Sequence, residues 1–129
     1  MLAVGAQDKL GALGYQIAQE ETPMPRDCRG LEMTAVSDAA VGAYDLTIRA
    51  YLAFARDTGD RLKAVYAADA DMPMAHCLKG YFFQLFSNPA LHPKAEQALA
   101  QAAKAADARG ANPRERMHIA ALAAWRQGD

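Results

Sequence analysis

Residues 112–129 read NPRERMHIAALAAWRQGD, and this stretch says most about the fold. Asn112 is a favourable N-cap, Pro113 fits the first helical position, and Glu115 can complete a capping box. These signals predict a helix over 113–126. Its apolar residues occupy two adjoining faces, one with Met117, Ala120, Ala121 and Ala124, the other with Ile119, Leu122 and Trp125. A surface helix of a closed bundle needs only one apolar stripe, so this pattern is typical of a helix stacked between neighbours in a solenoid.

The rest of the chain is also patterned as helices, and strand signals are nearly absent. Ser37 and Asp38 are suited to open the first of these helices, and Thr58–Gly59 to break it. Gly110 fits the position just past the end of the last one. We expect four helices before residue 112, over about 37–56, 60–69, 73–86 and 92–109.

The helix expected over 73–86, PMAHCLKGYFFQLF, is apolar almost all round. Only His76, Lys79 and Gln84 interrupt it, which is typical of a central, buried helix. Its aromatic residues are Tyr81, Phe82, Phe83 and Phe86. We expect these rings in the hydrophobic core, and a ligand cage is the alternative.

Residues 1–36 differ from the remainder. Leu10, Leu13 and Ile17 are spaced for a short amphipathic helix, although nearby glycines weaken it. Two prolines then favour an extended loop. We therefore divide the chain into an N-terminal extension, 1–36, and a helical domain, 37–129.

Composition narrows the functional classes. The net charge is −1 and the pI is near 6.3, so no overall field recruits nucleic acid or an anionic membrane. No apolar run approaches the roughly 18 residues of a membrane span. Cys28 and Cys77 lie far apart without a CxxC motif, which fits a reducing compartment. We expect a cytoplasmic protein with neither nucleic-acid nor membrane partners.

Three stretches of the chain resemble a known family in order and spacing. They are MTAVSDAAVGAYD (33–45), AADADMPMAHCLKGYFF (67–83) and NPRERMHIAALAAWRQGD (112–129). From Asp27 to Asp129 the chain is similar to the N-terminal part of the tetratricopeptide repeat protein 38 family, whose members are longer. The spacing of Pro73 and Pro113 exceeds the standard repeat of about 34 residues, and the usual W-LG-Y motif is not cleanly matched.

The resemblance implies a fold and carries no established activity across. The implied fold is all-α, with antiparallel helical hairpins stacked as a short, TPR-like α-solenoid of about five helices plus an N-terminal helix. It also implies a mainly cytoplasmic protein. On this reading the chain is an incomplete repeat array, a fragment or a short relative of the family.

His76 and His118 are the sharpest candidates for a ligand site. If their helices stack in register, both imidazoles face one groove, with Tyr81 and Trp125 as further lining residues. A metal site needs three or four ligands, and no HxxxH or CxxC pair supplies them. The alternative is that each histidine satisfies a local structural partner.

No catalytic constellation is visible. Cys77 follows His76 directly, so the two side chains point apart on a helix, and a buried structural thiol is the better interpretation. Cys28 falls in a loop and is expected to be exposed. We predict no catalytic residue, no metal and no cofactor, and the sequence disfavours an enzyme.

The leading hypothesis is therefore a protein- or peptide-binding scaffold. The alternative is part of a longer helical-repeat enzyme or small-molecule-binding protein, with His76 and His118 lining a groove. The C-terminal helix is a candidate interface through Met117, Leu122 and Trp125, because exposing these residues would leave an apolar patch. We expect the N-terminal helix, or a second copy of the chain, to cover it.

Overall fold

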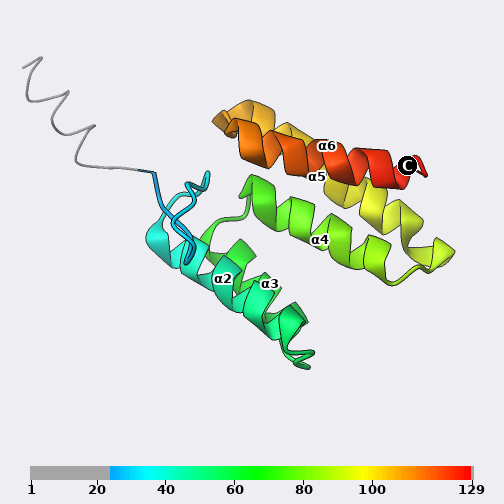
Figure 1. The fold of residues 1–129 in the computed structure, drawn as a ribbon, viewed down its shortest axis with the longest axis horizontal. Coiled ribbons are helices and arrows are strands. Elements are labelled where there is room, and N and C mark those ends of the chain that lie inside the picture. Colours follow the sequence, from blue (N-terminus) through cyan, green and yellow to red (C-terminus); the bar gives the residue numbers. More distant parts are fainter. Residues whose placement is uncertain (1–23, 129) are drawn as a thin grey trace, which may run out of the picture.

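The computed structural model describes residues 24–128, which are helical with no strand beyond an isolated bridge between Arg26 and Glu32. Five α-helices and one 3-10 turn make up this part (Figure 1): α2 (Asp38–Leu52), α3 (Thr58–Ala68), α4 (Pro73–Leu85), η1 (Pro89–Leu91), α5 (His92–Arg109) and α6 (Pro113–Arg126). The all-α prediction is confirmed. The expected N-terminal helix lies outside the described residues.

The helices pair in chain order. α2 and α3 form one hairpin, α4 and α5 form a second, and α6 packs against both helices of the second hairpin. α3 touches α4 over a much smaller region, and Figure 1 shows the α2–α3 hairpin diverging from α4. α4 is therefore the central helix, since it contacts α3, α5 and α6.

The predicted helix ends hold at most positions. The Ser37 side chain accepts a hydrogen bond from the Ala40 backbone at the start of α2. Asn112 and Glu115 form the expected capping box of α6. Gly110 ends α5 in the left-handed conformation with φ 70°, which glycine adopts at low cost.

The first helix ends earlier than predicted. α2 stops at Leu52, and Thr58–Gly59, expected to break it, instead begins α3. The reversal occurs over 53–57, a segment without glycine or proline. The sequence over 53–57 therefore carries no turn signal, although the chain turns there.

Close packing of α4 on α6 depends on small residues. A Cβ atom on Gly80 would lie 2.5 Å from Cδ2 of Leu122, so only glycine leaves room for that side chain. Leu122 is fully buried, and Ile119 one turn before it is also buried. The prediction that Leu122 lies in an exposed interface is wrong, because it fills the space over Gly80.

Several apolar residues of α6 stay exposed in the described structure. Met117 is 72% exposed and Trp125 is 37% exposed. Ala120 and Ala121 also face solvent. Of the two apolar faces expected on this helix, the one with Ile119 and Leu122 is packed within residues 24–128.

Residues 24–36 are attached to the helical domain by three carboxylates. The Glu115 carboxylate accepts bonds from the Thr34 backbone at 3.0 Å and from the Thr34 hydroxyl at 2.7 Å. Asp69 accepts from the Val36 backbone, and Asp45 from the Cys28 backbone. This part of the assigned extension therefore packs with the helices that follow it.

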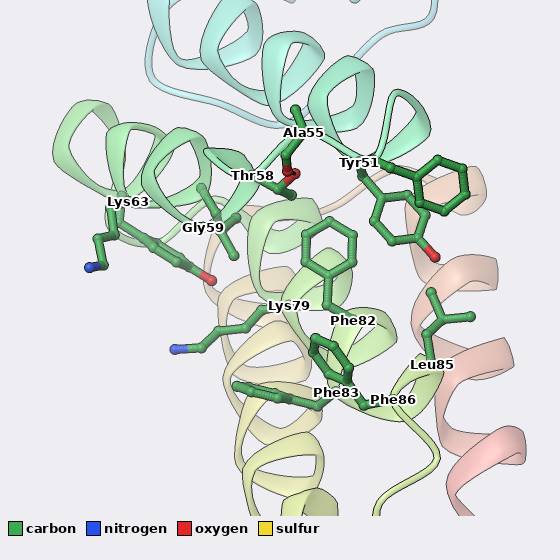
Figure 2. Close-up of a pocket in the computed structure, with 13 residues that line it drawn as sticks. Tyr51, Ala55, Thr58, Gly59, Lys63, Lys79, Phe82, Phe83, Leu85 and Phe86 are labelled. Carbon is green, nitrogen blue, oxygen red and sulfur yellow. Dashed lines mark hydrogen bonds between the residues drawn. The ribbon is translucent and has the colours of Figure 1, made fainter.

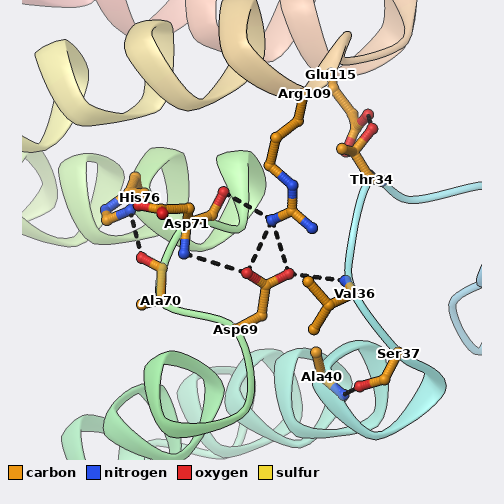
Figure 3. A network of polar contacts seen from close by, with 10 residues as sticks. All are labelled: Thr34, Val36, Ser37, Ala40, Asp69, Ala70, Asp71, His76, Arg109 and Glu115. Atoms are coloured by element: carbon orange, nitrogen blue, oxygen red, sulfur yellow. Dashed lines mark hydrogen bonds and ion pairs between the residues drawn. The ribbon is translucent and has the colours of Figure 1, made fainter.

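One buried carboxylate joins the two hairpins (Figure 3). Nη1 of Arg109 donates to both carboxylate oxygens of Asp69, at 2.8 and 2.9 Å. The same nitrogen donates to the backbone carbonyl of Asp71 at 3.0 Å. Arg109 lies at the end of α5 and Asp69 caps the end of α3. This contact holds the end of the first hairpin against the end of the second.

Candidate binding cleft

An apolar cleft of about 650 Å³ lies between the α2–α3 hairpin and α4 (Figure 2). Its lining is largely aromatic and aliphatic: Tyr51, Phe54, Ala55, Thr58, Gly59, Leu62, Lys63, Tyr66, Lys79, Phe82, Phe83, Leu85 and Phe86. The volume falls within the range of about 300–1,000 Å³ usual for ligand pockets. The described structure thus has a concave surface large enough to receive several apolar groups.

The cleft exists because α3 and α4 meet at one end and separate toward the other. At the closed end the Tyr66 hydroxyl donates to the Ala75 carbonyl at 3.2 Å, and the Tyr66 ring lies 5.1 Å from the His76 ring. At the open end α3 presents only the small residues Thr58 and Gly59. Nothing large from α3 fills the space beside the second half of α4.

Three phenylalanines at the end of α4 and directly after it line this space and do not form the core. Phe82 and Phe83 are only partly buried, and Phe86 is 69% exposed. The Phe82 ring stacks on Tyr51 with their centroids 4.9 Å apart. The expectation of core positions for these rings is wrong, because the diverging hairpin leaves one side of α4 without a partner helix.

Tyr81 was expected with them and lies on another face of α4. Its hydroxyl donates to the backbone carbonyl of His118 at 2.9 Å, and its ring lies 6.1 Å from the Trp125 ring. Tyr81 therefore helps to hold α6 on α4.

Phe54 at the lip of the cleft combines two unfavourable features. Its backbone is left-handed, with φ 54°, and its side chain is 92% exposed. The Phe54 N–H donates to the Tyr51 carbonyl, and the Ala55 N–H to the Ala50 carbonyl. These are the two bonds of a Schellman motif, in which the left-handed position normally holds glycine. A bulky residue there costs about 1–2 kcal/mol, and its exposed ring gains little burial in return.

The charged residues of the cleft lining are Lys63 and Lys79. The Lys79 ammonium lies 5.6 Å from the centroid of the Tyr66 ring and 6.0 Å from that of Phe83. Lys94 of α5 approaches the Phe83 ring at 5.9 Å. Cation–π attraction at such distances holds the ammonium groups of Lys79 and Lys94 beside the aromatic rings that line the cleft.

A smaller groove of about 280 Å³ adjoins the cleft between α4 and α5. It shares Lys79 and Phe83 with the cleft, and its remaining lining is His76, Lys94, Gln97, Ala98 and Gln101. The groove is polar, with two ammonium groups and two amides. An apolar surface and a cationic surface therefore meet at Lys79 and Phe83.

His76 has a local partner in this groove. Its Nε2 lies 3.0 Å from the Ala70 carbonyl, so that nitrogen carries the proton and donates. Burial lowers the pKa of His76, while the bond to Ala70 opposes the shift. This is the arrangement expected of a structural histidine.

His118 lines a different cavity, of about 300 Å³, beneath the loop before α2. Tyr81, Arg29 and Arg114 share that cavity. Burial lowers the pKa of His118, and Arg114 and Arg29 lower it further. The two imidazoles do not face one groove, so the acid–base pair considered from the sequence is not assembled in the described part of the chain.

The cysteines occupy the positions expected of them. Cys77 is buried and Cys28 is exposed, and neither forms a disulfide. Burial raises the pKa of the Cys77 thiol to about 12, so it stays protonated near neutral pH. Among residues 24–128, no three histidine, cysteine or carboxylate side chains group as metal ligands.

The fold and cleft define a class of protein: an all-α chain of packed helical hairpins with an apolar, lysine-flanked cleft between the first two. No protein-family model, curated protein or solved structure matches this chain. Within the described residues, no helix is both long and apolar enough to cross a bilayer.

Sequence reasoning missed the cleft residues contributed by the α2–α3 hairpin. Phe54 falls inside the helix expected over 37–56, and the spacing of Leu62 and Tyr66 in the helix expected over 60–69 predicts only that they face inward. A signal was present in Tyr51 and Phe54, two large rings three residues apart where α2 ends and the chain reverses. That signal becomes interpretable only once the end of α2 is known.

Proposed function

We propose that this chain is a TPR-like helical-repeat module that binds a helical segment of a partner protein in the cleft between α3 and α4. The observation that carries the proposal is the strained, exposed Phe54 at the lip of an aromatic cleft. Stability alone does not favour a phenylalanine there. Contact with a partner would bury the Phe54 ring, and this burial would offset the free-energy cost of its left-handed backbone.

The hairpin order supports the repeat interpretation. Two consecutive hairpins followed by a further helix is an order compatible with the tetratricopeptide repeat protein 38 family, to which the three quoted stretches are similar. Repeat proteins of this kind commonly present grooves to peptides. The two free cysteines, one of them exposed, support placement in the reducing cytoplasm.

A helix fits the cleft through one face. An α-helix with side chains is about 10–12 Å across, so a cleft of this volume takes a single apolar stripe and leaves the rest of the helix outside. Binding through i, i+3, i+4 and i+7 anchors is the usual mode for such grooves. Tyr51, Phe82 and Phe83 provide the aromatic surface on which those anchors would pack.

The test is a titration of fluorescein-labelled amphipathic peptides of about 15 residues, followed by anisotropy. Phe86→Ala is expected to weaken binding about tenfold or more, as for an aromatic anchor. Met117→Ala is the matched control, because Met117 is as exposed as Phe86 and lies outside the cleft. The proposal fails if no amphipathic peptide binds, or if both variants weaken binding equally.

A further inference from the structure

We infer that the cleft selects partner helices whose apolar stripe is flanked by carboxylates, and that the α4–α5 groove receives one of those carboxylates. The inference rests on the proposed function and specifies the chemistry of the partner. Its basis is the set of lysines around the cleft.

These lysines have no carboxylate partner in the described part of the chain. All six ion pairs among residues 24–128 use arginine as the cation. Lys63, Lys79 and Lys94 are exposed and take part in none of them. The linings of the cleft and of the adjoining groove contain no aspartate or glutamate. Both linings therefore carry ammonium groups and no carboxylate, in a protein of net charge −1.

The lysines also lie where the flanks of a bound helix would pass. Lys63 lies on α3, Lys79 on α4 and Lys94 on α5, so each of the three helices that border the cleft and the groove contributes one ammonium group. Figure 2 shows the side chains of Lys63 and Lys79 extending to the same side, beyond the aromatic rings. A helix with its apolar stripe on Phe82 and Phe83 would bring the residues along one of its flanks to these ammonium groups.

The side chains of the α4–α5 groove favour a carboxylate over a neutral side chain on the flank of the bound helix. Lys79 and Lys94 approach the ring of Phe83 from the cleft and from α5, and Gln97 and Gln101 add amide donors. A carboxylate can accept from both ammonium and amide groups at once. A lysine flank would meet like charges, and such repulsion excludes wrong partners.

The experiment uses three labelled peptides with the same length and apolar stripe, and with flanking residues that are all Glu, all Gln or all Lys. For the full chain we expect the Glu peptide to bind about tenfold more tightly than the Gln peptide, from two or three partly exposed ion pairs. The Lys peptide should bind most weakly. The preference for Glu should shrink between low salt and about 0.3 M salt, because screening weakens exposed pairs.

The second part of the experiment reverses the charge of lysines on the protein. Lys79→Glu combined with Lys94→Glu should invert the preference, so that the Lys peptide binds best. Lys104→Glu is the matched control, since Lys104 is an exposed lysine of α5 outside both cavities, and it should leave the order unchanged. Circular dichroism verifies that each variant is folded.

The outcomes separate the two claims. Equal binding of all three peptides would overturn the inference and leave the proposed helix-binding function in place. Binding of none of them would overturn both. A preference for Glu that survives the double reversal would also overturn the inference, since other residues would then cause it.

Discussion

Phe54 shows at the scale of one residue how function and stability can separate. Its left-handed backbone is disfavoured for a phenylalanine, and its ring is 92% exposed. Replacing it should therefore affect binding and folding in opposite directions. Few positions in a small domain offer such a clear distinction between a structural and a binding role.

We predict that Phe54→Gly keeps or raises stability while weakening peptide binding about tenfold or more. Glycine removes a backbone penalty of about 1–2 kcal/mol, and its greater freedom in the unfolded chain offsets about half of that. The unfolding free energy should stay equal or rise by up to about 1 kcal/mol. Urea unfolding and anisotropy on the same sample measure the two effects. A clear loss of stability would show that the Phe54 ring supports the fold.

His76 gives a residue-scale prediction for pH. Burial lowers its pKa below the ordinary value, so folding favours the neutral imidazole. Its contribution to stability is complete above about pH 6.5 and is lost as the pH falls through the lowered pKa. We expect the urea midpoint to decrease from pH 7.5 to pH 5.5, and to decrease less in His76→Gln. An identical decrease in the variant would assign the effect to other groups, among which His118 is shifted in the same direction.

At the scale of elements, the start of α6 depends on Glu115. This residue is fully buried, and its carboxylate accepts from Asn112 in its own capping box and from Thr34 in the segment before α2. One side chain therefore both begins a helix and attaches a loop from 81 residues earlier in the chain.

We predict that Glu115→Ala lowers the unfolding free energy by about 2–4 kcal/mol, because it removes the cap and leaves the buried Thr34 donors without a partner. Glu115→Gln should cost less, since glutamine also completes a capping box. Urea denaturation measures both. Equal losses in the two variants would contradict the role given to the cap.

At the scale of the whole molecule, the exposed outer face of α6 leads to a prediction about the association state. Met117 is largely exposed there, beside Ala120 and Ala121. The sequence pattern predicts that residues 1–23 or a second copy of the chain covers this face. Residues 1–23 lie outside the described structure. The two arrangements differ in mass and are therefore separable in solution.

If a second copy covers the face, light scattering should show a dimer for the full chain, and Met117→Lys should shift it toward monomer. If residues 1–23 cover it, the full chain should be monomeric and a variant lacking them should self-associate. A monomer in every case would contradict both arrangements. Val36→Lys, at an exposed apolar residue that is not part of α6, is the control for general solubility.

The sequence by itself determined the helices and most of their ends. Asn112, Pro113 and Gly110 act through the backbone of their own neighbours, so their effect is readable without knowing the fold. The exposed Cys28 and buried Cys77 followed in the same way from their local patterns. It also indicated that α4 is central, because an almost wholly apolar helix must be covered on several sides.

Only the tertiary structure decided which apolar faces are covered. Leu122 is buried because Gly80, 42 positions earlier, leaves room for it, and Phe86 is exposed because the α2–α3 hairpin diverges from α4. That divergence also produces the cleft, and His76 and His118 line two separate cavities on other sides of α4. The physical reason is that capping is a local hydrogen-bonding property, whereas burial depends on which distant side chains arrive, and helical periodicity does not encode the angle between two hairpins.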